Sequence, residues 1–131
     1  MLFRSADFQG YMPHKEVLKM QKSSQVLLLL LNDTPNVMGV VPGKLFEYMA
    51  SRRLILAIGP KEGDSARILL ESEAGKVCGF PDKAAMKGAI RRYFEEWKQG
   101  ELTGNTSDIS AYSRRGVTGQ MAGLLDGLLD K

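Results

Sequence analysis

Two short apolar runs constrain the fold of this chain more than any other feature of its sequence. Val26 to Leu31 and Leu54 to Ile58 contain no polar residue, and a segment of helical character lies between them. Runs of this length joined by a crossover helix are typical of buried parallel strands. A short third strand is predicted at Lys76 to Gly79, after another helical segment. The alternation predicts an α/β fold with a Rossmann-like parallel sheet flanked by helices.

Start and stop signals set the bounds of the expected helices. Pro13 suits the start of a helix, and Asp64 and Asp82 are predicted to cap two others. Gly75 is predicted to end the helix that begins at Asp64. The helices are expected from His14 to about Ser23, from Gly43 to Arg52, from Asp64 to about Ala74, after Asp82 through Trp97, and from Ser110 to Leu129.

Other segments receive simpler predictions. Residues 5–9 are a weak strand candidate, and residues 101–109 are expected to link the closing helix, 110–129, to the rest of a single partial domain. Cys78 is interpreted as a core residue. Two stripes keep helical spacing, and only the first is interpreted as core. They are Ala85, Met86, Ala89, Ile90, Tyr93, Phe94 and Trp97, and then Val117, Met121, Leu124, Leu125 and Leu128.

The start of the second helix has the chemistry of an anion site. Parallel strands end at one edge of a sheet, which is where α/β folds bind ligands, and this helix is expected to begin there. Pro42-Gly43-Lys44 offers free backbone N–H groups, no β-carbon at Gly43 and a cation. Phosphate is the usual anion at such a helix start.

Glu47 lies one turn beyond Lys44 on the same predicted helix face. A carboxylate there accepts hydrogen bonds from sugar hydroxyls, so phosphate and polyol recognition together indicate a nucleotide or nucleotide sugar. The alternative is that Glu47 is a solvated residue paired with Lys44. His14, at the start of the first helix, is interpreted as a surface or capping residue.

Composition excludes several classes of function. The chain has 131 residues, 44% of them hydrophobic and 25% charged, as in an ordinary globular domain. A net charge of +3 without an aromatic and basic platform argues against nucleic acid as a partner. The single cysteine allows no internal disulfide, makes a metal cluster unexpected and favours a cytoplasmic setting. No signal-peptide layout and no apolar stretch of membrane-spanning length is found.

Three stretches in order resemble one known family. They are Gly10–Val17 (GYMPHKEV), Ser24–Leu30 (SQVLLLL) and Pro42–Ala57 (PGKLFEYMASRRLILA). They are similar to the C-terminal, donor-binding domain of group 1 glycosyltransferases, which have the GT-B fold, and the similarity runs from about residue 5 to residue 81. The resemblance implies that backbone N–H groups near Val41, Gly43 and Lys44 meet the diphosphate of a nucleotide-diphosphate sugar, with no separate cofactor.

The resemblance also assigns roles to other residues and shows departures from the family. Glu47 is implied to bind the ribose hydroxyls, and the turn at Tyr11 and Met12 to meet the base. Many family members carry a further glutamate eight positions before the one that matches Glu47, where this chain has Gly39. The family's basic pair for the diphosphate would precede residue 1. With Gly39 in place of that glutamate, the family's acidic contact to the donor sugar is not expected from this position.

On this interpretation the chain is a fragment, an incomplete GT-B C-terminal domain. The missing N-terminal domain would bind a hydroxyl acceptor, a sugar or a lipid-linked sugar, as in polysaccharide or glycolipid biosynthesis. The isolated chain is expected to bind donor weakly and to catalyse no transfer. The full-length protein is expected in the cytoplasm or at the membrane surface, and the exposed sheet edge predicts a homodimer for the fragment.

Two other functions stay open. One is another sugar-nucleotide enzyme on the same fold, such as an epimerase, which would need acid and base groups in the cleft beyond Glu47 and Asp33. The other is a non-enzymatic α/β interaction module of the receiver type, which would need an acidic pair beside Asp33.

Overall fold

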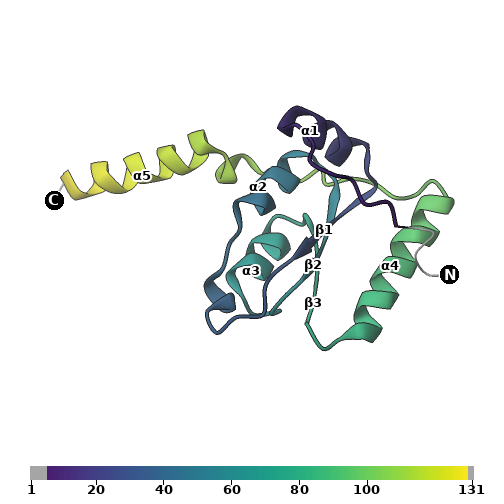
Figure 1. The fold of residues 1–131 in the computed structure, drawn as a ribbon. Coiled ribbons are helices and arrows are strands. Elements are labelled where there is room, and N and C mark those ends of the chain that lie inside the picture. The colour runs from purple at the N-terminus through teal and green to yellow at the C-terminus, as the bar shows by residue number, and fades with distance from the viewer. Residues whose placement is uncertain (1–5, 130–131) are drawn as a thin grey trace.

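The computed structural model describes residues 6–129, which form a small sheet of three parallel strands with helices on both faces (Figure 1). The strands are β1 (Val26–Leu30), β2 (Leu54–Ile58) and β3 (Gly75–Cys78), and they lie in the order β1-β2-β3. Val26 pairs with Leu54, and Ile55 pairs with Gly75. The expected α/β class and parallel sheet are confirmed.

The helices follow the predicted alternation with the strands. They are α1 (His14–Ser23), α2 (Gly43–Ala50), α3 (Asp64–Glu71), α4 (Lys83–Lys98) and α5 (Arg114–Leu129), with short 3-10 turns η2 (Val37–Gly39) and η3 (Ser110–Tyr112). Asp82 is the predicted cap of α4, since its side chain accepts a hydrogen bond from the Ala85 amide at 2.9 Å.

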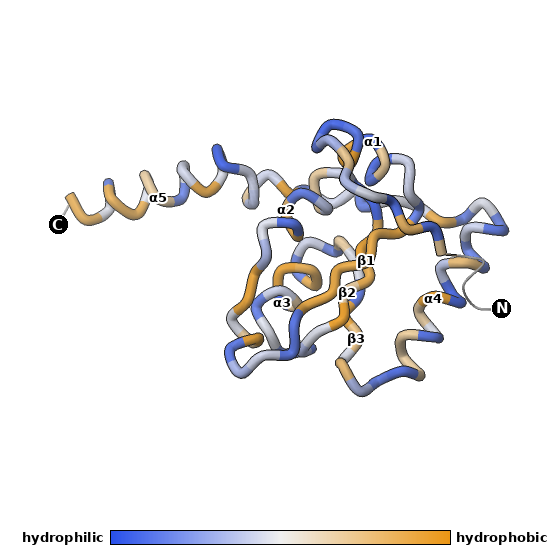
Figure 2. Tube along the Cα trace, viewed as in Figure 1, coloured by the Kyte–Doolittle hydropathy of each residue, from blue (hydrophilic) through white to orange (hydrophobic). Residues whose placement is uncertain are grey.

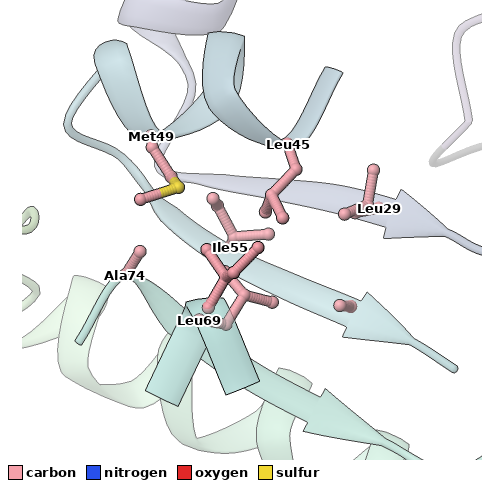
Figure 3. Close-up of a cluster of buried hydrophobic side chains, with 8 residues drawn as sticks. Leu29, Leu45, Met49, Ile55, Leu69 and Ala74 are labelled. Carbon is pink, nitrogen blue, oxygen red and sulfur yellow. The ribbon is translucent and has the colours of Figure 1, made fainter. Parts of the chain in front are cut away.

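The main core lies between the sheet and helices α2 and α3 (Figure 3). Leu45 and Met49 lie four positions apart on α2 and so point from one helix face toward Ile55 of β2. Leu69 of α3 closes the cluster from the other side, and none of these side chains is more than 1% exposed. This packing fixes the orientation of α2 about its axis, and with it the direction of Glu47.

Helix α4 covers the opposite face, but only in part. Ala89 and Tyr93 are buried against Leu56 and Cys78, which confirms Cys78 as a core residue. The prediction that the whole stripe on α4 is core is wrong for its last part. Three of its residues are half-exposed or more: Ile90, Phe94 and Trp97.

The exposed stripe has a cause in the sheet. Strand β1 buries Leu27 and Leu29 on the α2 face, whereas Leu28 and Leu30 on the other face are 53% and 65% exposed. Within residues 6–129, α4 packs over β2 and β3 and no element covers β1 on that side. Figure 2 shows apolar strands next to this open side. The continuous apolar run predicted that both faces of β1 are buried, but in the structure only the face toward α2 is buried.

Three local predictions need correction. Residues 6–9 form no strand: Phe8 is 87% exposed, and the Gln9 side chain bonds locally to Asp7. Residue 5 lies outside the described residues. Asp64 is the first residue of α3 and not its N-cap, which is Gly63, and the helix ends at Glu71 rather than near Ala74. The left-handed residue after α3 is Glu73, with φ 52°, so Gly75 is free to begin β3.

The segment after α4 is anchored rather than loose. Asn105 is 6% exposed, and its backbone amide donates to the Arg52 carbonyl at 2.9 Å. The closing helix is interrupted at Ser113, whose Oγ accepts a hydrogen bond from Gly116 N at the start of α5. Helix α5 buries no residue and extends away from the sheet (Figure 1). Across residues 6–129, no helix combines the length and apolarity that crossing a bilayer requires.

Candidate functional site at the carboxyl edge of the sheet

The two loops at the carboxyl ends of β1 and β2 pack against each other. A β-carbon at Gly59 would lie 2.6 Å from Leu31 Cδ1, so a larger residue there would have to displace the Leu31 side chain at the end of β1. Ser65 Oγ donates to the Val40 carbonyl at 2.7 Å, which ties the loop before α2 to the start of α3. Ser65 is 2% exposed. The loop that leads into α2 is therefore held in place by buried contacts.

The amino end of α2 is open. Pro42 precedes the helix and provides no side-chain cap, and Gly43 and Lys44 are exposed. A β-carbon at Gly43 would meet no atom within 4 Å, so the space beside it is free. The Leu45 amide bonds back to the Pro42 carbonyl at 2.9 Å. The amides of Gly43 and Lys44 come before the helical hydrogen-bond ladder and are available to a ligand.

The neighbouring helix start differs in charge. Helix α3 begins with Asp64, which complements the positive end of its own helix and pairs with Arg67 at 3.2 Å. Helix α2 has no acidic residue in its first turn and carries Lys44 there. Among residues 6–129, Lys44 forms no ion pair. The start of α2 therefore has a positive charge that the described part of the chain does not balance.

Glu47 points toward α1 and not into the apolar core. Its Oε1 accepts a hydrogen bond from Gln21 Nε2 at 2.5 Å, and its Oε2 lies 3.8 Å from His14 Nε2. The carboxylate side chain is 31% exposed. Its partners come from α1, and the alternative pairing with Lys44 is not seen in the described residues. Glu47 thus remains reachable by a ligand through Oε2.

The other predicted site residues are placed as follows. Val41 is half-buried against the main core and fixes the backbone that enters α2. Tyr11 is 100% exposed and Met12 is half-exposed, in the irregular segment before Pro13 where a turn was predicted. His14 follows two residues later and reaches Glu47, so the turn lies close to the α1–α2 contact. The described contacts bring Glu47 and α1 together and leave the Tyr11 ring without packing.

Gln21 was not among the predicted site residues. It lies 26 residues from Glu47 in sequence, so no local spacing could pair the two. Its burial at 6% exposure is the signal that identifies it, since glutamine is mostly exposed in proteins.

Burial, and then the neighbouring charge of Glu47, raise the pKa of the Tyr48 hydroxyl above its ordinary value.

Gly39 faces an acidic group from another element. A β-carbon at Gly39 would lie 3.9 Å from Asp64 Oδ2. A glutamate at that position would extend toward a second carboxylate, and like charges so close repel each other. Asp64, at the start of α3, therefore places a carboxylate next to Gly39, which has no side chain of its own.

Two hollows elsewhere on the molecule differ in chemistry from the start of α2. One, of about 320 Å³, lies at the amino ends of the strands, lined by Gly75, Lys76 and residues 103–107. Ligands of α/β sheets bind at the opposite edge. The other, of about 280 Å³, is apolar and lies between β1 and α4 beside Trp97. Neither provides the combination of free amides and a cation that the start of α2 has. The part of the chain that is described contains no cluster of metal-binding side chains.

The chain matches no protein-family model, no curated protein and no solved structure in the comparisons.

Proposed function

We propose that this chain is the donor-binding part of a glycosyltransferase, which holds a nucleotide-diphosphate sugar at the amino end of α2. The observation that carries the proposal is the open start of that helix, where Gly43 and Lys44 are exposed residues whose amides precede the helical ladder and no side chain caps the helix. A diphosphate there would accept hydrogen bonds from the amides and gain from the helix dipole.

The second support is the distance along the helix between the cation and the acid. Lys44 lies in the first turn of α2 and Glu47 one turn further, partly exposed. In a nucleotide diphosphate the ribose directly follows the phosphates. A carboxylate accepts both protons of a vicinal diol, which is the chemistry that reads a ribose. The turn at Tyr11 and Met12, close to this contact through His14, is the proposed neighbour of the base.

The contribution of this part to sugar transfer is electrostatic. As the bond between the sugar and the diphosphate breaks, negative charge builds on the leaving diphosphate. Fixed N–H dipoles and the Lys44 ammonium stabilise that charge at the transition state more than in the ground state. The sugar passes to a hydroxyl of an acceptor, a sugar or a lipid-linked sugar, bound by another domain.

Affinity measurements with uridine, guanosine and thymidine diphosphates test the proposal. We expect Lys44→Ala to weaken binding of the preferred diphosphate by roughly tenfold, because one contact to a charged oxygen is lost. Lys87→Ala is the matched control, since Lys87 is an exposed lysine of α4 on the other side of the sheet. Equal affinities for the two variants, or no binding of any diphosphate, would contradict the proposal.

The alternative functions gain no support from the site. An epimerase needs an acid and a base close to the sugar, and Asp33 lies in the exposed loop after β1. A receiver-type module needs an acidic pair beside Asp33. No metal-binding group of three or more acidic, histidine or cysteine side chains occurs within residues 6–129.

A further inference from the structure

The side chain of Gln21 is buried without being fully satisfied. It is 6% exposed, and its Oε1 has no hydrogen-bond partner within residues 6–129. Its Nε2 makes one hydrogen bond, to Glu47 Oε1 at 2.5 Å. A leucine or methionine of similar size would fill the same space without burying an unpaired oxygen. The bond to Glu47 is what this glutamine provides that an apolar residue does not.

The orientation of the amide follows from the charge of its partner. Glu47 is an acceptor when ionised, so the amide group facing it must be the NH₂ donor. The reverse orientation would set the amide oxygen against the carboxylate. The unpaired oxygen is therefore a consequence of the contact with Glu47, because the amide cannot direct both of its ends toward partners in this space.

The contact limits the freedom of Glu47. A glutamate on a helix surface has several rotatable bonds and samples many positions. Here Oε1 is fixed by a donor that is itself buried on α1, while Oε2 faces the exposed imidazole of His14, whose side chain is 69% exposed. Each carboxylate oxygen has two lone pairs, so Oε1 keeps one for a ligand and Oε2 keeps both.

We propose that Gln21 is a positioning residue that holds the Glu47 carboxylate in the orientation that accepts the two hydroxyls of a ribose. The inference rests on the proposed function, and it names the feature of the donor that the α1–α2 contact recognises, the 2′-hydroxyl together with its 3′ neighbour. A carboxylate already fixed in place loses less freedom when the diol binds, so the ribose is favoured over a deoxyribose.

The test compares uridine diphosphate with 2′-deoxyuridine diphosphate on the 131-residue chain. For the wild type we expect the ribonucleotide to bind roughly tenfold more tightly, the difference that one hydrogen bond to a charged group makes. In Gln21→Leu this preference should fall toward unity, mainly because the ribonucleotide binds more weakly. Gln99→Leu, at an exposed glutamine after α4, should keep the wild-type preference.

A second variant separates positioning from packing. Gln21→Met keeps the length of the side chain but donates no hydrogen bond, so a purely structural role would be restored and the ribose preference would not. Should either folded variant keep the full preference, the positioning role is overturned and the donor site stands. If the wild type binds both nucleotides equally, the ribose preference is absent and the inference is overturned, while the diphosphate site stands. If it binds neither of them and no guanosine or thymidine diphosphate, the proposed function itself fails. Loss of folding in both variants would show that Gln21 serves the α1–α2 contact alone, which also overturns the inference.

Discussion

At the scale of single residues, the close approach of two strand backbones restricts which residue can begin β3. A β-carbon at Gly75 would lie 1.8 Å from the Ile55 carbonyl oxygen, inside the sheet where β3 begins beside β2. The backbone of β2 cannot move away, because Ile55 is completely buried in the main core. Glycine at this position is thus required by the sheet and not by a turn.

We predict that Gly75→Ala destabilises the chain by roughly 1–3 kcal/mol, because the added methyl group forces the two strands apart. Urea unfolding measures the change. Gly88→Ala is the control: a β-carbon at Gly88 meets no atom within 4 Å, and the residue lies inside α4. There alanine should stabilise the protein by up to about 1 kcal/mol. A stable Gly75→Ala variant would mean that β3 does not pair with β2 in this register.

The residue scale also shows what could be predicted about the site. The Pro42-Gly43-Lys44 start of a helix could be recognised locally, and the structure begins α2 at Gly43. The partners of Glu47 could not, because spacing within one helix suggests Lys44, whereas tertiary packing of α1 provides Gln21 and His14.

At the scale of elements, bounds set by local chemistry were predicted well and burial was not. The bounds of α1 and β2 agree with the sequence pattern, since Pro13 directly precedes α1 and Gly59 directly follows β2. The stripe on α4 has the spacing of a core helix, yet Ile90, Phe94 and Trp97 in that stripe are half-exposed or more. Periodicity reports that one face is apolar, but whether another element covers that face is a property of the whole molecule.

The buried face of α4, on which Tyr93 lies, gives a prediction for alkaline pH. Burial is the main cause that raises the pKa of the Tyr93 hydroxyl above 10.0, and the residue is 8% exposed. The buried, protonated Tyr93 hydroxyl contributes stability that is fully present below the pKa this tyrosine has in the unfolded chain. That stability is lost as pH rises through the higher pKa of the folded chain, because ionisation then favours unfolding. Tyr93→Phe should therefore unfold at a higher pH than the wild type.

Circular dichroism during alkaline titration measures this midpoint. At neutral pH the Tyr93→Phe variant should be about as stable as the wild type, since the ring is retained. Tyr11→Phe, at a completely exposed tyrosine, should leave the alkaline midpoint unchanged. An unchanged midpoint for Tyr93→Phe would show that α4 does not bury this ring.

At the scale of the whole molecule, the chain exposes more surface than its mass predicts. Its accessible surface is 9943 Å², whereas a compact monomer of 14.5 kDa has about 6,900 Å². The excess comes from α5, which buries no residue, and from the open apolar side of β1 and α4. The excess, about 3,000 Å² per chain, is larger than the roughly 800 Å² that each partner buries in a standard-size interface.

We expect two copies of the chain to pair through the free edge of β1, where the backbone groups on the outer side are open to another strand. Leu28→Lys combined with Leu30→Lys places charges on the exposed face of that strand and should yield monomers. Light scattering after gel filtration gives the mass. A wild-type monomer across the concentration range would contradict this expectation.

The central claim is that the start of α2 receives the diphosphate of a nucleotide. Its most direct test is a ¹H–¹⁵N NMR titration of the chain with uridine diphosphate and, for comparison, with uridine. The account predicts that the diphosphate shifts the amide signals of Gly43 and Lys44 most strongly, and that uridine leaves them nearly unchanged. Shifts confined to residues 103–107, at the opposite end of the sheet, or equal shifts with uridine, would contradict it.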